Sequence, residues 1–137
     1  MFNLCLDNCF LILSLFLVMA RLKTCSLNVN GMQDASKRLN IFKCLKKQNS
    51  DIFLLQEVHL SNSQENDTWT SQWGGPAFWS YGSNYSRGVT ILFNPKSSFY
   101  FNSISQKADT EGRVLSLSVN IESITIKLVN VYAPKVP

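Results

Sequence analysis

The sequence predicts an α/β domain that opens with a β-α-β unit and continues as a series of strands. Residues 22–28 alternate apolar and polar side chains, as a strand does, and end before the turn dipeptide Asn30-Gly31. Residues 35–45 repeat apolar side chains at helical spacing, and residues 52–55 form an apolar run typical of a strand buried on both faces. Together these segments predict one β-α-β unit.

Length and composition limit the chain to a single globular domain. It has 137 residues, of which 45% are hydrophobic and 16% charged, which excludes a disordered, collagen-like or coiled-coil chain. The net charge of +4 permits a polyanionic partner without requiring one. The four cysteines form no CxxC pair and show no metal-ligand spacing, so we expect reduced thiols and neither a zinc site nor a disulfide framework.

The predicted helix carries much of the positive charge. It is expected to begin after the capping residue Asp34 and to end at about 49–50. Residues 21–48 contain seven basic residues, Arg38 among them, and one acid. Either a solvated helix face or a phosphate-facing patch accounts for this bias. The predicted buried face of the helix consists of Ala35, Leu39, Phe42 and Leu45.

Strands dominate the second half of the chain. Residues 61–76 are interpreted as a polar loop or a short irregular helix, followed by a strand over 88–93 and an edge strand over 98–104. Residues 113–121 alternate clearly, and residues 124–132 are expected to return as the partner strand. The predicted inward side chains are Leu115, Leu117, Val119 and Ile121.

An apolar segment precedes the domain-like part of the sequence. Residues 10–20 are apolar except for Ser14, a run too short to cross a bilayer unaided, so we do not expect a membrane partner. We divide the chain into a leader, residues 1–20, and a domain, residues 21–137. The leader is interpreted either as a secretory signal, although no basic residue precedes the run, or as an extension irrelevant to the fold.

Polar residues follow both strands of the β-α-β unit. Asn28 ends the first strand, and Glu57 follows the second. Because the two strands of a right-handed β-α-β unit are parallel, their carboxyl ends lie along the same edge of the sheet. A carboxylate beside an amide oxygen suits Mg²⁺. The alternative is that Asn28 only makes the turn and Glu57 caps the next segment.

Five short segments, taken in order, resemble a known family. They are SLNVNG at 26–31, LQEVH at 55–59, RGVTILF at 87–93, DTEGR at 109–113 and NVYAP at 130–134. Together they resemble the first half of the endonuclease/exonuclease/phosphatase family, which includes the AP endonucleases and DNase I. Within it they are most similar to the endonuclease domain of LINE-type retrotransposon polyproteins.

The resemblance implies a fold, an activity and a set of site residues. The fold is the amino-terminal half of a two-sheet α/β sandwich of the DNase I type, a mixed sheet with a flanking helix. The activity is phosphodiester hydrolysis on DNA with Mg²⁺ or Mn²⁺ and no small-molecule cofactor, in the nucleus or cytoplasm. The implied catalytic residues are Asn28, Glu57 and Tyr132, with Glu57 and Asn28 as metal ligands, and the implied substrate-binding residues are Asn30, His59 and Asn130.

Two of these assignments keep an alternative. His59 is expected either to contact phosphate or to lie in solvent, and it is the only histidine of the chain. Arg113 is expected to support the fold or an ion pair rather than the reaction.

The chain also departs from the family pattern. It ends at Pro137, roughly midway through such a domain, and lacks the later Gly-Asp-Phe-Asn and Ser-Asp-His segments. Lys135 stands where relatives usually have Asn. We therefore expect a truncated, catalytically impaired copy that builds only one of the two sheets and folds poorly by itself. The alternatives are a non-catalytic nucleic-acid-binding remnant or a phosphatase of the same family.

Overall fold

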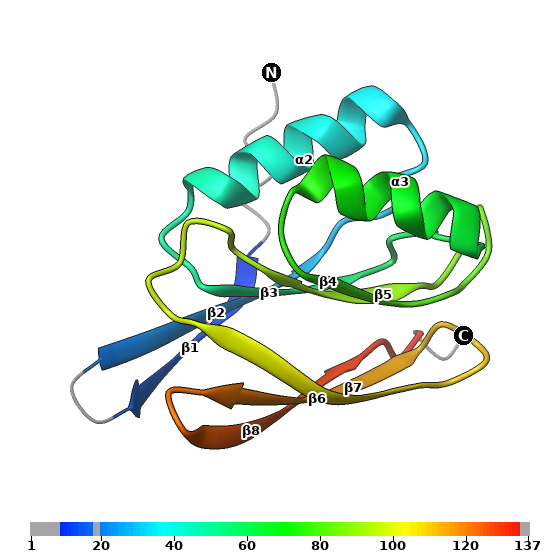
Figure 1. The fold of residues 1–137 in the computed structure, drawn as a ribbon. Helices are drawn as coiled ribbons and strands as arrows, with labels where there is room; N and C mark the ends of the chain where they lie inside the picture. Colours follow the sequence, from blue (N-terminus) through cyan, green and yellow to red (C-terminus); the bar gives the residue numbers. More distant parts are fainter. Residues whose placement is uncertain (1–8, 18–19, 135–137) are drawn as a thin grey trace.

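The computed structural model of the protein describes residues 9–17 and 20–134, with side chains from residue 21 onward. Its elements form three layers: two helices, a mixed five-stranded sheet (sheet A) and an antiparallel three-stranded sheet (sheet B) (Figure 1). In chain order they are β1 (Cys9–Leu17), β2 (Ala20–Asn28), α2 (Ala35–Lys47), β3 (Ile52–Gln56), α3 (Ser63–Trp73), β4 (Ala77–Ser80), β5 (Val89–Phe93), β6 (Phe101–Ala108), β7 (Val114–Ile121) and β8 (Ile124–Val131).

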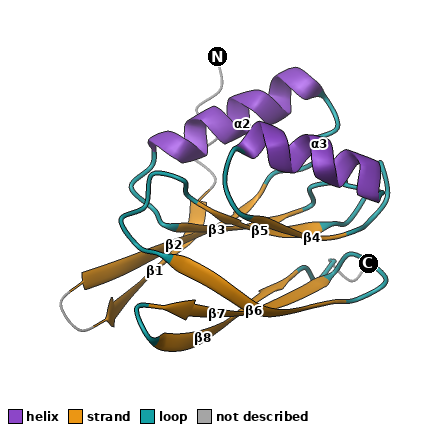
Figure 2. Ribbon diagram, viewed as in Figure 1, coloured by secondary structure: helices purple, strands orange, loops and turns teal. Residues whose placement is uncertain are grey.

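Sheet A contains the predicted β-α-β unit. Its strand order is β1-β2-β3-β5-β4, and β2 and β3 are parallel, with Asn28 opposite Gln56. The other neighbouring strands of sheet A are antiparallel. Helices α2 and α3 cover the same face of this sheet (Figure 2). The predicted fold class, a mixed sheet with a flanking helix, is confirmed, and the carboxyl ends of β2 and β3 lie along one edge.

Strand β1 comes from the segment interpreted as a leader. It pairs with β2 in antiparallel register and lies at one edge of sheet A. Whether residues 1–20 also act as a secretory signal stays a prediction. In the part of the chain that the structure describes, no helix is long and apolar enough to cross a membrane.

The cysteines differ from the expectation of reduced thiols. Cys25, in β2, is disulfide-bonded, whereas Cys44, in α2, is free. A disulfide requires two Cα atoms close together in space, which the spacing of cysteines along the sequence does not report. The prediction is therefore wrong for Cys25.

Helix α2 begins as predicted but buries a different face. The Lys37 backbone N–H donates to Asp34 Oδ1 at 2.7 Å, which caps the helix. Leu39 is 46% exposed and Ala35 is also exposed, so the prediction is wrong for both. The buried residues of the helix are Arg38, Ile41, Phe42 and Leu45.

Arg38 explains this shift of the buried face. Its guanidinium donates to the Met32 carbonyl at 2.8 Å and to Gln72 Oε1 at 2.7 Å, and it stacks over the Trp69 ring at 4.7 Å. A buried cation is tolerated because its donors are used and its flat head packs on an aromatic face. Arg38 thus belongs neither to a solvated face nor to a phosphate-facing patch.

Residues 61–76 contain a regular helix rather than a polar loop. The Glu65 backbone N–H donates to Asn62 Oδ1 at 2.9 Å at the start of α3, and Gly74, with φ 76°, ends it. Trp69 and Trp73 lie one turn apart and are buried against sheet A. Because only these two residues carry the apolar face, the hydrophobic pattern was too sparse to predict the full helix.

Sheet B covers the inner face of sheet A, so the expectation that only one sheet is built is wrong. Phe53 and Leu55 pack toward the helices, while Ile52 packs toward sheet B.

Strand β6 lies about three residues later than the predicted edge strand. The layer between the sheets contains Leu22, Ile52, Val89, Ile91 and Phe93 from sheet A and Leu115, Leu117, Val119, Ile121 and Leu128 from sheet B. The predicted inward-facing side chains of β7 are confirmed. The expectation of poor folding rested on an uncovered face of sheet A, and sheet B covers that face.

A pair of identical substitutions tests this packing. Ile91 is fully buried between the sheets, whereas Ile104 on β6 is 58% exposed. We expect Ile91→Val to lower the free energy of unfolding by about 0.5–1.5 kcal/mol, because it removes one buried methylene. Ile104→Val is expected to change it by less than about 0.5 kcal/mol. Urea unfolding measures both, and equal effects would contradict the two-sheet core.

Candidate active site

Three of the predicted site residues meet at the carboxyl end of β3. Glu57 directly follows this strand, and its Oε2 lies 2.7 Å from His59 Nε2. The Tyr132 hydroxyl, just after β8, donates a hydrogen bond to the Glu57 carboxylate. The Arg87 backbone N–H also approaches Glu57 Oε2, at 3.3 Å. We call Glu57, His59 and Tyr132 the Glu57 cluster.

The Glu57 cluster presents an anion. Burial by itself raises the pKa of Glu57, but hydrogen bonds from Tyr132, His59 and the Arg87 N–H outweigh it and hold the pKa below its usual range. The hydrogen bond to Glu57 raises the pKa of Tyr132, with burial adding to the effect, so the phenol stays a protonated donor. The Glu57 side chain is 13% exposed, so an ionised carboxylate oxygen remains within reach of a ligand.

The backbone around the cluster is unusual. Glu57, His59 and Arg87 have positive φ angles of 57°, 62° and 65°, a conformation that non-glycine residues adopt rarely. Gly31 has φ 87°, and a Cβ atom there would lie 2.7 Å from His59 Nδ1. Only glycine leaves room for the imidazole at this position. Strained backbone of this kind gathers at functional sites, which supports a functional role for the cluster.

Our sequence reasoning assigned Gly31 to a turn and missed its place beside His59. The turn itself is as predicted, since Asn30 and Gly31 have positive φ angles of 50° and 87°. The Gly31 N–H donates to the Glu57 carbonyl at 2.6 Å. The contact with His59 connects residues far apart in the sequence. The Asn-Gly dipeptide was therefore the available signal, but it indicated only the turn.

Asn28 and Asn30 lie at the adjacent strand end. Both are exposed, and the Asn30 N–H donates to Asn28 Oδ1 at 3.0 Å, so Asn28 does make the turn that the alternative interpretation foresaw. The Asn30 carbonyl accepts a hydrogen bond from Lys37 Nζ at 2.8 Å. Asn28 pairs with Gln56 across the strands, which places it next to the start of the Glu57 segment. Their roles with metal and substrate stay predictions.

Asn130 lies beneath the site rather than on its surface. It is 2% exposed, and its Nδ2 donates to the carbonyls of Leu55 and Thr90, both at 2.8 Å. Its Oδ1 accepts from Gln56 Nε2 at 2.7 Å. These three bonds connect β8 of sheet B to β3 and β5 of sheet A. The structure therefore places Asn130 between the sheets, and its role in binding substrate stays a prediction.

The donor set of the site fits a hard cation that needs few protein ligands. Among the described residues, no three His, Cys, Asp or Glu side chains gather to form a cage. Mg²⁺ commonly uses one or two carboxylates and keeps several waters. Glu57 supplies one ionised carboxylate, and the Asn28 amide oxygen lies at the neighbouring strand end. These residues would hold such an ion, with substrate or water completing its shell.

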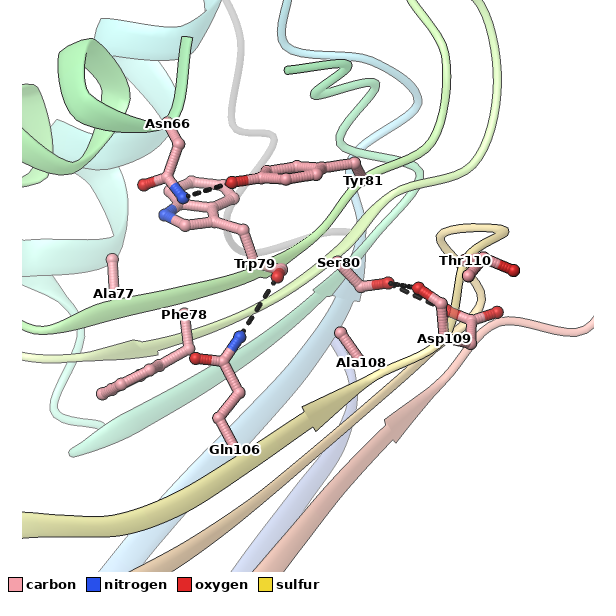
Figure 3. A pocket seen from close by; sticks show the side chains of 10 residues that line it. All are labelled: Asn66, Ala77, Phe78, Trp79, Ser80, Tyr81, Gln106, Ala108, Asp109 and Thr110. Atoms are coloured by element: carbon pink, nitrogen blue, oxygen red, sulfur yellow. Dashed lines mark hydrogen bonds between the residues drawn. The ribbon is translucent and has the colours of Figure 1, made fainter. Parts of the chain in front are cut away.

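A second acidic group, Asp109, serves the fold. It lines a pocket beside β4 and β6, where its Oδ1 accepts from Ser80 Oγ at 2.9 Å (Figure 3). The backbone N–H groups of Arg113 and Val114 each donate to the same oxygen at 3.0 Å. Glu57, His59 and Tyr132 are not among the residues that line this pocket. The Asp109 carboxylate fastens the loop that enters β7.

Asp109 should therefore make stability depend on pH. Burial by itself raises its pKa, but hydrogen bonds from Val114, Ser80 and Arg113 outweigh it and lower the pKa below its usual range. A carboxyl group whose pKa is lower in the folded than in the unfolded state stabilises the fold at pH values above its unfolded pKa, about 3.9. This stabilisation is lost as the pH falls through the folded-state pKa. We expect Asp109→Asn to melt lower than wild type at pH 7 and to lose less stability in acid. Melting temperatures between pH 7 and pH 2 test this, and parallel curves would contradict it.

The chain is similar to known proteins in sequence and in fold. No family model matches the chain. It is 31% identical over 109 residues to the Transposon TX1 uncharacterized 149 kDa protein of Xenopus laevis. The match covers 80% of this chain and 8% of the transposon protein. The AP endonuclease from Archaeoglobus fulgidus superposes with a TM-score of 0.55 and 25% identity, over 82% of this chain and 41% of the other.

The chain thus spans a small part of the transposon protein and under half of the AP endonuclease. Both matches cover about four fifths of this chain. One relative is a transposon protein, and the other has a similar fold over most of this chain. These matches bear out the predicted resemblance to AP endonuclease- and DNase I-like proteins of retrotransposon type, because the chain has the fold of an AP endonuclease and a transposon-encoded relative.

Proposed function

We propose that this protein is a retrotransposon-type endonuclease that hydrolyses phosphodiester bonds in DNA with the help of Mg²⁺ or Mn²⁺. The observation that carries the proposal is the Glu57 cluster, an ionised carboxylate bound by an imidazole and a phenol at the carboxyl ends of parallel strands. The AP endonuclease and the transposon protein support a nuclease-type function.

Each residue of the site has a distinct task in this proposal. Glu57 and Asn28 would hold the divalent ion, which supplies charge neutralisation at a phosphate oxygen. His59 holds Glu57 through its 2.7 Å contact, which fixes the direction of the carboxylate. Tyr132 keeps its proton and presents a hydroxyl beside the anion, where it can also contact a phosphate.

The loop beside the cluster offers groups that suit a nucleic acid. Tyr85 is 88% exposed, on the same loop whose Arg87 N–H contacts Glu57. Exposed aromatic rings stack on bases or sugars, and a cation such as Arg87 on the same loop attracts the phosphate backbone. DNA is therefore the substrate that we propose.

We also propose that the chain is catalytically impaired by itself. Its only histidine already contacts Glu57, and in the described part of the chain no second carboxylate makes a hydrogen bond or ion pair with the Glu57 cluster. Activation of water and stabilisation of the transition state commonly need additional groups beside one carboxylate. Slow cleavage or binding without cleavage is therefore expected of residues 1–137.

A plasmid-nicking assay tests the proposal. Supercoiled plasmid is incubated with Mg²⁺ or with EDTA, and with either this chain or a fusion to the part of the Archaeoglobus fulgidus AP endonuclease that the match leaves uncovered. We expect Mg²⁺-dependent nicking by the fusion and much less by the chain alone. DNA binding without nicking by either protein would favour the non-catalytic alternative.

A further inference from the structure

A polar pocket lies at the opposite end of sheet A from the Glu57 cluster. Its walls come from the turn between α2 and β3 and from the loop that follows β5, and it encloses about 210 Å³. Lys46 and Lys96 line it together with amide and hydroxyl side chains, among them Asn49 and Ser98. We call it the basic pocket. Strand β3 runs from the pocket to the Glu57 cluster, so roughly 17 Å of extended chain separate the two.

The lysines of the basic pocket are not neutralised by an acid. Among the described residues, neither Lys46 nor Lys96 forms an ion pair. Lys46 Nζ lies 5.1 Å from the centre of the Trp73 ring, a cation–π contact that positions the ammonium group and leaves its charge intact. Lys47 follows Lys46 at the end of α2, and the backbone of Lys23 is hydrogen-bonded to the turn before β3. Four lysines therefore lie in or next to the pocket.

The acid in the lining, Asp51, is used by the fold. Its Oδ2 accepts the Lys23 N–H at 2.8 Å, and its Oδ1 accepts the Ser97 hydroxyl at 2.7 Å. The Asn94 N–H donates to the Asp51 carbonyl at 2.8 Å, and Asn94 Nδ2 donates to the Ser50 carbonyl at 2.9 Å. These bonds join β2, the turn before β3 and the loop after β5. The pocket therefore has a fixed polar frame and a net positive charge.

The position of the lysines is not explained by α2 alone. Cations stabilise the carboxyl end of a helix within its last turn, which accounts for Lys46 and Lys47. Lys23 belongs to β2 and Lys96 to the loop after β5, so two further elements bring positive charge to the same end of the sheet. The described residues of the lining include no aromatic side chain on which a base could stack. A ligand would therefore be recognised through its charge and its hydrogen-bond acceptors.

We propose that the basic pocket is a second nucleic-acid-binding site, which binds the phosphate backbone of DNA or RNA. Lysine, amide and hydroxyl groups are donors that contact phosphate oxygens in protein–nucleic acid complexes. The inference goes beyond the proposed function, because it requires neither Glu57 nor a metal. It also assigns Lys46 and Lys47, from the basic segment 21–48, to a phosphate-facing patch rather than to a solvated helix face.

Backbone amide signals in NMR spectra test this inference without cleavage. The isotope-labelled full chain is titrated in EDTA with a short DNA duplex, a short single-stranded RNA or oligoglutamate. Amides of residues 46–51 and 96–98 report on the basic pocket, and those of residues 57–59 report on the Glu57 cluster. The two nucleic acids distinguish the sources of the phosphate backbone, and oligoglutamate represents an acidic peptide.

Two matched double variants separate the pocket from the overall charge of the protein. Lys46→Gln/Lys96→Gln removes two charges from the pocket, and the control, Lys107→Gln/Lys127→Gln, removes two from exposed positions of β6 and β8. We expect DNA, RNA or both to shift the pocket amides. In the pocket variant, the dissociation constant read from these amides should rise about tenfold or more, and the slope of log K against log salt should fall by about two. The control should change the dissociation constant by less than about twofold.

The inference would be overturned by the absence of pocket shifts with both nucleic acids, by equal weakening in the control, or by equally tight binding of oligoglutamate. If the double variant of the pocket does not fold, Lys96→Gln carries the test alone, with a slope reduced by about one. Pocket shifts without plasmid nicking by the chain or the fusion would leave the inference standing and contradict the nuclease proposal. Nicking without pocket shifts would do the reverse.

Discussion

Replacing Glu57 with glutamine is expected to lower Mg²⁺-dependent nicking at least a hundredfold, in whichever form of the protein cleaves plasmid, the chain or the fusion. Glutamine preserves the shape of the side chain but removes the charge that would hold the metal. In the wild type, hydrogen bonds from Tyr132, His59 and the Arg87 N–H stabilise the ionised Glu57 carboxylate. The substitution therefore removes the negative charge of the site and leaves its other residues in place. Nicking rates over a range of Mg²⁺ concentrations measure the effect.

Glu122→Gln is the matched control for this experiment. Glu122 is exposed in the turn between β7 and β8, at the opposite end of sheet B from Tyr132. A substitution of Glu65 would be an unsuitable control, because the Glu65 carboxylate accepts hydrogen bonds from the Ser61 N–H at 2.9 Å and from Gln33 Nε2 at 3.1 Å. If Glu57→Gln and Glu122→Gln slow nicking equally, the site lies elsewhere.

Asn130→Asp should be the most destabilising of the substitutions considered. The new carboxylate would set an acceptor against the Leu55 and Thr90 carbonyls, which now accept from the Asn130 amide. Each buried hydrogen bond that loses its partner costs about 1–3 kcal/mol. We expect the free energy of unfolding to fall by about 3 kcal/mol or more, measured by urea denaturation.

Asn102→Asp provides the same chemical change at an exposed position of β6. Its free energy of unfolding should stay within about 0.5 kcal/mol of wild type. A loss at Asn130 no larger than at Asn102 would show that the bonds between β8 and sheet A do not hold the two sheets together.

The parts of the fold predicted correctly were those with a strong local pattern. The β-α-β unit, the Asp34 cap and the alternating row of β7 all follow from apolar spacing and turn residues. The strand ends of the unit also predicted the edge at which Glu57 lies. Local periodicity was sufficient there because each element buries a regular face.

The parts that were missed depend on contacts between distant residues. Arg38 is buried because the Met32 carbonyl and the Trp69 ring lie beside it, which no hydrophobic pattern encodes. The hydrogen bonds of Asn130 connect the two sheets, a contact that its place in a sequence motif did not indicate.

The most direct test of the central claim locates the metal relative to His59. The chain has one histidine, and its Nε2 lies 2.7 Å from Glu57, so its imidazole NMR signals report on this site alone. We predict that Mn²⁺ at substoichiometric concentrations broadens these signals selectively, that excess Mg²⁺ restores them, and that Glu57→Gln removes the effect. Broadening no stronger than the average over the protein, or unchanged broadening in Glu57→Gln, would contradict a divalent-metal site at the Glu57 cluster.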